Sequence, residues 1–148
     1  MFVSFIIPAC GSVPFIASQV VAQSQTAAKT KGDEYLQQGL KYYQVSQLTL
    51  AIQSWEKALT SYRELKNRQR EGETLGNLGL AHRDIGEYNK AIDYQQQALK
   101  IFQELNNRQA QGQLLGNLGN VYSLIGDYKK AEEYQHQSLT IAREIKDR

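Results

Sequence analysis

The feature that most constrains the fold is a five-residue segment, Leu-Gly-Asn-Leu-Gly, which stands at residues 75–79 and returns at residues 115–119. The copies are forty residues apart (115 − 75 = 40), and about half of the surrounding positions recur at the same interval. Matched positions include Gly86 and Gly126, Tyr88 and Tyr128, Ala91 and Ala131, Tyr94 and Tyr134, and Arg108 and Arg148. Such recurrence is typical of stacked repeats, in which each unit buries its apolar side against its neighbours.

Composition narrows the class of protein further. The chain has 148 residues and a formal charge of +2, with both signs interspersed, so it predicts one small domain without the clustered basic face of a nucleic-acid-binding protein. The short basic run at residues 66–70 is interpreted as the end of a helix, where cations are favoured by the helix dipole. The single cysteine, Cys10, lies outside the repeats and excludes an internal disulfide.

The first 22 residues differ from the rest because they contain no charged side chain. Two apolar runs, 2–7 and 13–21, are broken by Pro8, Gly11 and Pro14, which disfavours a membrane-spanning helix. Small residues up to Ala22, followed by polar residues, are typical of a secretory signal peptide. We therefore expect cleavage near Ala22 and export to the periplasm or the extracellular space.

Three alternatives for this segment remain open. No Lys or Arg follows Met1, which fits an uncleaved anchor or a mis-assigned start better than a standard signal, and a mis-assigned start implies a cytoplasmic protein. A weaker interpretation takes Cys10 as the lipidated residue of a lipoprotein.

Residues 23–32 are small and polar and predict a flexible spacer before an array that runs from 33 to 148.

Apolar residues three and four apart predict paired amphipathic helices throughout the array rather than strands. The first unit, about 33–66, is expected to have helices at about 33–45 and 48–66; units two and three are expected at about 72–106 and 112–146. Gly86 and Gly126 are predicted to end the first helix of their units, since glycine accepts the left-handed conformation found there. Close helix approach is expected at three pairs: Gly39 with Ala58, Gly79 with Ala98, and Gly119 with Ser138.

These residues resemble the tetratricopeptide repeat. The leucine-glycine pair of that family corresponds to Leu78-Gly79 and Leu118-Gly119, with Gln38-Gly39 in the first unit, and the small residues of its second helix correspond to Ala91 and Ala131. The period exceeds the common 34 residues and is similar to the long-helix subclass of kinesin light chains and of bacterial, especially cyanobacterial, repeat regions. The resemblance implies an all-α, right-handed α-solenoid of three repeats that binds a partner protein and is not an enzyme.

The same resemblance implies a concave groove formed by the first helix of each unit, in which asparagines pair with the backbone of a bound peptide. The residues at these positions, and those expected to shape selectivity beside them, are Asn77, Asn117, Asn120, Arg83, Leu80, Leu40 and Leu124. An amide donates and accepts hydrogen bonds at once, so it suits a peptide bond whatever the ligand side chain. The alternative is that Asn77 and Asn117 bond neighbouring backbone of their own chain.

No pattern indicates catalysis, a metal site or a cofactor. His82 and His136 lie in non-equivalent helices, and His82 replaces a repeat aromatic, which predicts a half-buried packing residue. The glycines follow helices rather than strands, unlike phosphate-binding loops. Because Arg83 is the one cation expected in the groove, recognition of a peptide carboxyl terminus is not expected.

The last helix leaves apolar residues without an expected neighbour, namely Leu139, Ile141 and Ile145. This suggests either a relative of a longer protein or a surface that associates with something else. The alternative to peptide binding is therefore a structural spacer or an oligomerisation module that stacks through this end.

Overall fold

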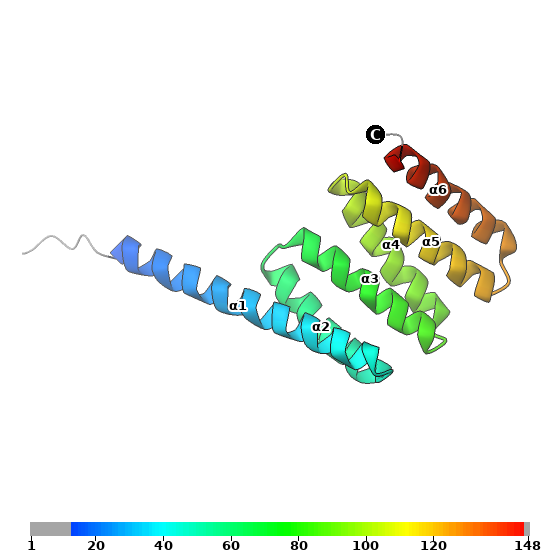
Figure 1. Cartoon of the computed structure of the whole chain (residues 1–148). Helices are drawn as coiled ribbons and strands as arrows, with labels where there is room; N and C mark the ends of the chain where they lie inside the picture. The colour runs from blue at the N-terminus through cyan, green and yellow to red at the C-terminus, as the bar shows by residue number, and fades with distance from the viewer. Residues whose placement is uncertain (1–12, 147–148) are drawn as a thin grey trace, which may run out of the picture.

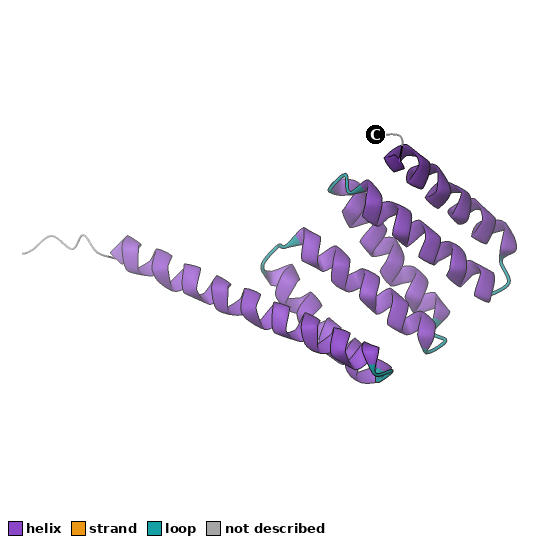
Figure 2. Cartoon of the chain, viewed as in Figure 1, coloured by secondary structure: helices purple, strands orange, loops and turns teal. Residues whose placement is uncertain are grey.

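The protein is described by a computed structural model that covers residues 13–146, and that part of the chain is built of helices (Figures 1 and 2). The six helices are α1 (Val13–Gln44), α2 (Leu48–Glu64), α3 (Arg68–Asp84), α4 (Tyr88–Glu104), α5 (Arg108–Leu124) and α6 (Tyr128–Lys146). Helices α1 and α2, α3 and α4, and α5 and α6 form three helix-turn-helix units, stacked in chain order from blue to red in Figure 1. The predicted all-α solenoid of three repeats is confirmed.

Helix α1 is longer than the other helices because it continues toward the N-terminus, where it extends beyond the array (Figure 1). The prediction of a flexible spacer at residues 23–32 is therefore wrong, since these residues lie within α1. Alanine, glutamine and lysine in this stretch are good helix formers, and Gly32 at its end lies against Tyr62 of α2. Most of the expected signal segment, including Cys10, lies outside the described residues, and none of the helices described is long and apolar enough to cross a membrane.

The second and third units begin four residues earlier than expected. Helices α3 and α5 start at Arg68 and Arg108 rather than near 72 and 112, and the side chains of Asn67 and Asn107 cap them by accepting from backbone N–H groups three residues on. The basic run at 66–70 is thus mainly the first turn of α3, not the end of α2. The turns before these helices contain a residue with positive φ, as do the turns at Gly86 and Gly126, where φ is 83°.

The core runs along the stack in two connected clusters, one centred on α1 to α4 and one shared by α4, α5 and α6. Close approach within a unit involves the expected glycines but different partners. A Cβ atom on Gly79 would lie 2.5 Å from Cγ of Gln95, and one on Gly119 would lie 2.7 Å from Cγ of Gln135, so Ala98 and Ser138 are not the nearest neighbours. In the first unit, the indole of Trp55 covers Gly39, and its Nε1 donates to the carbonyl oxygen of Leu36.

Candidate functional site

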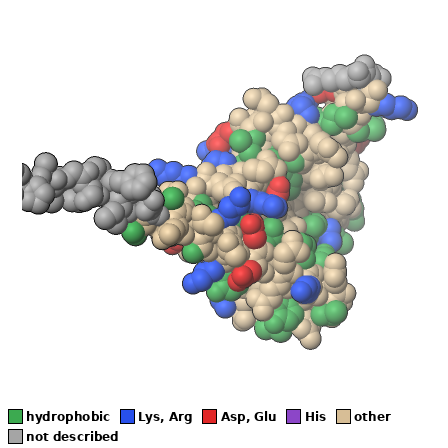
Figure 3. Space-filling model, turned by 60° about the vertical axis from the view of Figure 1, so that its left-hand side comes forward, with side chains coloured by type: hydrophobic (Ala, Val, Ile, Leu, Met, Phe, Trp, Pro, Cys, Tyr) green, Lys and Arg blue, Asp and Glu red, His purple; other side chains and the backbone are tan. Residues whose placement is uncertain are grey.

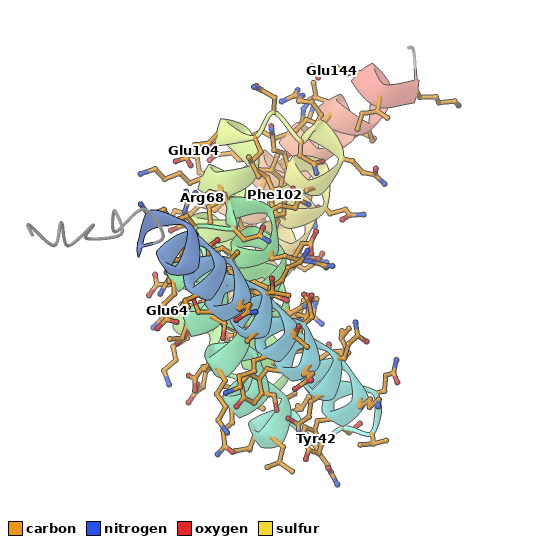
Figure 4. All side chains as sticks on the ribbon, turned by 90° about the vertical axis from the view of Figure 1, so that its left-hand side faces the viewer. Tyr42, Glu64, Arg68, Phe102, Glu104 and Glu144 are labelled. Atoms are coloured by element: carbon orange, nitrogen blue, oxygen red, sulfur yellow. The ribbon has the colours of Figure 1, made fainter. Side chains whose placement is uncertain are left out.

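A groove lies between α3 and α5 on the side of the array formed by the first helix of each unit. Its volume is about 330 Å³. Apolar side chains line it at Leu80, Phe102 and Leu114. Gly76 of α3 has no side chain to fill the groove, and a Cβ atom there would lie 3.6 Å from Cδ2 of Leu114 on the opposite side. Phe102 belongs to α4 and is almost fully buried, so it is part of the groove base (Figure 4). The site is thus a shallow hollow with an apolar base.

Three of the seven predicted residues lie in this groove: Asn77, Leu80 and Asn117. Asn77 and Asn117 are half-buried and stand at equivalent positions of α3 and α5. Among the side-chain hydrogen bonds of the described residues, neither amide bonds a group of its own chain, unlike the capping residues Asn67 and Asn107. Both amides therefore keep their hydrogen-bonding capacity for solvent or a ligand.

The other four predicted residues do not line this groove. Leu40 packs against the core of the first unit, Asn120 is exposed, and Leu124 is exposed at the end of α5. Arg83 contacts Asp84 at 2.7 Å, and Asp84 also accepts a hydrogen bond from the hydroxyl of Tyr43. The Arg83–Asp84 ion pair thus lies within α3, and the Tyr43–Asp84 hydrogen bond joins the ends of α1 and α3.

The structure adds polar residues that the sequence interpretation missed. Gln69 and Glu73 precede Asn77 at intervals of four on α3, and Gln109 and Gln113 precede Asn117 in the same way on α5. Residues four apart share a face of a helix, so this register could have been read from the sequence. Gln69 and Gln109 were missed because α3 and α5 were expected to begin after them, whereas Glu73 and Gln113 lie within the expected units and their shared face with Asn77 and Asn117 was overlooked.

The groove is nearly neutral. Glu73 is the one ionisable side chain among the lining residues, and it already accepts from Arg70 at 2.9 Å and from the Gln69 amide at 2.7 Å. No Lys or Arg lines this hollow. On the face seen in Figure 3, the basic and acidic side chains are interspersed rather than gathered by sign. The groove therefore offers a ligand amide groups and apolar surface rather than a strong electrostatic field.

The two histidines lie on different helices, His82 on α3 and His136 on α6. His82 is buried, stacks on Tyr94 with ring centroids 5.2 Å apart, and places Nδ1 2.7 Å from the Glu87 carboxylate, as suits the packing residue expected there. Hydrogen bonds from Lys90 and then from His82 hold the pKa of Glu87 below its ordinary value. Within residues 13–146, no three His, Cys, Asp or Glu side chains are grouped as metal ligands would be.

The comparison with protein families agrees with this architecture. A model of the family described as "Tetratricopeptide repeat" matches residues 34–104 and 73–144, which together cover most of the chain. The chain belongs to the tetratricopeptide repeat family. Repeats of this family generally form scaffolds for protein–protein interaction and are not typically enzymes. The search of curated proteins found no match.

Solved structures of tetratricopeptide proteins show the same fold. The TPR domain of Arabidopsis FLU is 21% identical with a TM-score of 0.75, and the match covers 78% of this chain and 98% of that one. BtubC (BKLC) from P. vanneervenii is 23% identical with a TM-score of 0.73, over 78% of this chain and 48% of that one. The TPR2AB domain of yeast Sti1, solved in complex with pHSP90, is 29% identical with a TM-score of 0.66.

The Sti1 match covers 77% of this chain and 42% of that one, so this chain spans less than half of the Sti1 and BtubC chains. Because FLU and BtubC are less than 25% identical to this chain, their likeness is one of fold.

Proposed function

We propose that the protein is a non-catalytic interaction module whose α3–α5 groove binds a peptide segment of a partner protein. The observation that carries the proposal is the presence of Asn77 and Asn117 in one hollow with Leu80, Phe102 and Leu114. The two amides are without a bond to their own chain, and the apolar base can hold a side chain of the ligand. The Sti1 structure supports the proposal because a relative of the same fold was solved as a complex.

The charge of the groove restricts the ligand class. A site that grips a peptide carboxyl terminus needs cations aimed at the carboxylate, and the lining residues include none. Arg83 is engaged by Asp84 outside the groove. The ligand expected here is an internal, largely uncharged segment with an apolar anchor, held through its backbone by the asparagine amides.

Affinity capture with the full chain as bait tests the proposal. The variant carries Asn77→Ala and Asn117→Ala, and the matched control carries Asn89→Ala, an exposed residue of α4 outside the groove lining. Truncating half-buried groove amides is expected to lower retention of a groove partner severalfold, since losing two hydrogen bonds costs about 1–3 kcal/mol in total. Circular dichroism melts must first show that the three proteins fold alike.

The readout includes the position of the partner, not only its recovery. A photoreactive residue at Gln113 is expected to crosslink the partner, whereas one at Asn89 is not. Equal recovery by the double variant, or crosslinking from Asn89 alone, would show that the groove is not the binding site.

A further inference from the structure

Exposed apolar side chains are concentrated at one edge of the array, the turn edge. It contains the three turns inside the units and the helix ends beside them, and it lies at the lower right of Figure 1. Eleven large apolar side chains are exposed among the described residues, and six of them belong to the turn edge: Val45, Leu50, Ile85, Leu124, Ile125 and Tyr128. Ile141 is buried against Gly112, so the expectation that it would be under-covered is wrong.

The three turns of the turn edge stand next to one another. The hydroxyl of Tyr43 near the end of α1 donates to the carboxylate of Asp84 at the end of α3, which joins the first turn to the second. Val45, Ile85 and Ile125 recur at intervals of forty and hold the same place in their turns, directly before a residue with positive φ. Since the first helices of the three units run in the same direction, these residues form a row along the edge (Figure 1).

The geometry of the turns alone does not explain this concentration. The turns of the opposite edge, at residues 64–68 and 104–108, also contain a residue with positive φ, yet Leu105 is the one large apolar side chain exposed in them. Glu104 and Arg108 flank Leu105. Leu124 and Tyr128 stand at the corresponding places in the last turn of the turn edge. Polar side chains therefore surround the apolar residue at one edge, and apolar side chains surround it at the other.

The turn edge also carries the excess positive charge of the chain. Residues 41–50, 81–90 and 121–130 contain five Lys or Arg against three Asp or Glu, and the charges of the remaining residues balance. Each acidic residue is paired with a cation of its own turn, namely Asp84 with Arg83, Glu87 with Lys90, and Asp127 with Lys130. Lys41 and Lys129 are exposed, and no ion pair to either is found within residues 13–146. These two lysines can therefore meet an anion from outside the chain.

Side chains of this kind and arrangement suit a lipid surface better than a second protein. A stable protein interface needs close shape complementarity over its core, which separate turn tips do not provide. The headgroup region of a bilayer accepts apolar side chains, and tyrosine is favoured at the boundary between membrane and water. Lysines near the surface are attracted by anionic headgroups. Aliphatic tips beside Tyr128, with lysines around them, therefore match the composition expected at a membrane surface.

We propose that the turn edge binds the surface of a membrane that contains anionic lipids. The row formed by Val45, Ile85 and Ile125 enters the headgroup region, while Lys41 and Lys129 contact lipid phosphates. None of these residues lines the α3–α5 groove, so the proposal does not rest on peptide binding there.

A fluorescent label compares the two edges in the full chain. Cys10→Ser removes the single native cysteine, and either Ile125→Cys or Leu105→Cys then carries a nitrobenzoxadiazole group. The two sites are matched, since Ile125 is 43% and Leu105 is 42% exposed and each ends its helix before a residue with positive φ. With vesicles of phosphatidylcholine and about 30% phosphatidylglycerol, the emission of the label at residue 125 is expected to move to shorter wavelength, and that at residue 105 is not. Vesicle binding through the apolar N-terminal residues would act on both proteins alike and would not produce this difference.

Charge reversal tests the part of the lysines. Lys41→Glu with Lys129→Glu should weaken vesicle binding of the chain labelled at residue 125 by at least about tenfold, because each lysine near an anionic surface contributes about fivefold. The control pair, Lys66→Glu with Lys100→Glu, makes the same change of charge near the opposite edge and should weaken binding much less. Emission shifts from both labels or from neither, an equal loss with both pairs, or equal binding to phosphatidylcholine alone would overturn the proposal. So would the same shift at residue 125 without vesicles and with a doubled mass in light scattering, because a second copy would then cover the edge.

Discussion

The second and third units carry the same residue at the same place in different environments. Gln95 of α4 is fully buried, and neither its amide nitrogen nor its amide oxygen has a hydrogen-bond partner. Gln135 of α6, forty residues later, is exposed. The difference arises because α5 covers α4, whereas no described helix covers α6. In a repeat array the neighbouring unit, not the residue type, decides what a position contributes to stability.

The largest expected effect contrasts Phe102 with Ala142, which hold equivalent positions on α4 and α6. Phe102→Ala removes a ring that is 3% exposed between covered units and should lower the free energy of unfolding by about 3–5 kcal/mol. Ala142→Phe adds a ring at the open face and should change stability by less than about 1 kcal/mol. Urea denaturation measures both. A cost for Ala142→Phe as large as that for Phe102→Ala would mean that the face of α6 is covered in solution.

The next effect compares Gly79 with Gly119. A leucine at Gly79 meets Gln95, which is fully buried and has no room to move aside, so overpacking should cost about 1–3 kcal/mol or more. A leucine at Gly119 meets Gln135, which can rotate into solvent, although the Ala131 carbonyl oxygen still lies 3.1 Å from the new Cβ. Both substitutions should lower the melting temperature, with the larger drop at Gly79. A Gly119→Leu melt equal to that of the parent would contradict the packing of α5 on α6.

The contrast shows how much the sequence could predict. The forty-residue period and the apolar spacing placed six helices in three units, because these signals are local and repeated. The starts of α3 and α5 were missed because the first turn of each is polar, although Asn67 and Asn107 are ordinary capping residues. Leu40 and Leu80 looked equivalent in sequence, yet one packs against the core of the first unit and the other lines the groove. Such differences depend on how neighbouring units pack against each other, and the sequence of a single unit does not contain that information.

A gain of stability is expected at Gln95. Leucine has a similar volume and carries no polar atoms, so Gln95→Leu removes an unsatisfied buried amide and should raise the free energy of unfolding by on the order of 1 kcal/mol. Gln135→Leu should leave stability almost unchanged, since that amide is solvated. Denaturant midpoints of the two variants provide the measurement. A loss at Gln95 would indicate that a bound water satisfies its amide in solution.

The smallest expected effect concerns Glu64 and Glu104, equivalent residues at the ends of α2 and α4 (Figure 4). Arg68 lies 2.5 Å from Glu104 and, by its hydrogen bond, lowers the pKa of that carboxyl below its ordinary value, whereas no ion pair to Glu64 is found within residues 13–146. A depressed folded-state pKa stabilises the protein above the unfolded pKa, and this contribution is lost as the pH falls through the folded value. Glu104→Gln should therefore lower the melting temperature slightly at pH 7 but not at pH 3, while Glu64→Gln should change neither. Because the Glu104 side chain is 47% exposed, the effect should also shrink in 1 M salt. If the two variants depend on pH in the same way, the Arg68–Glu104 pair does not persist in solution.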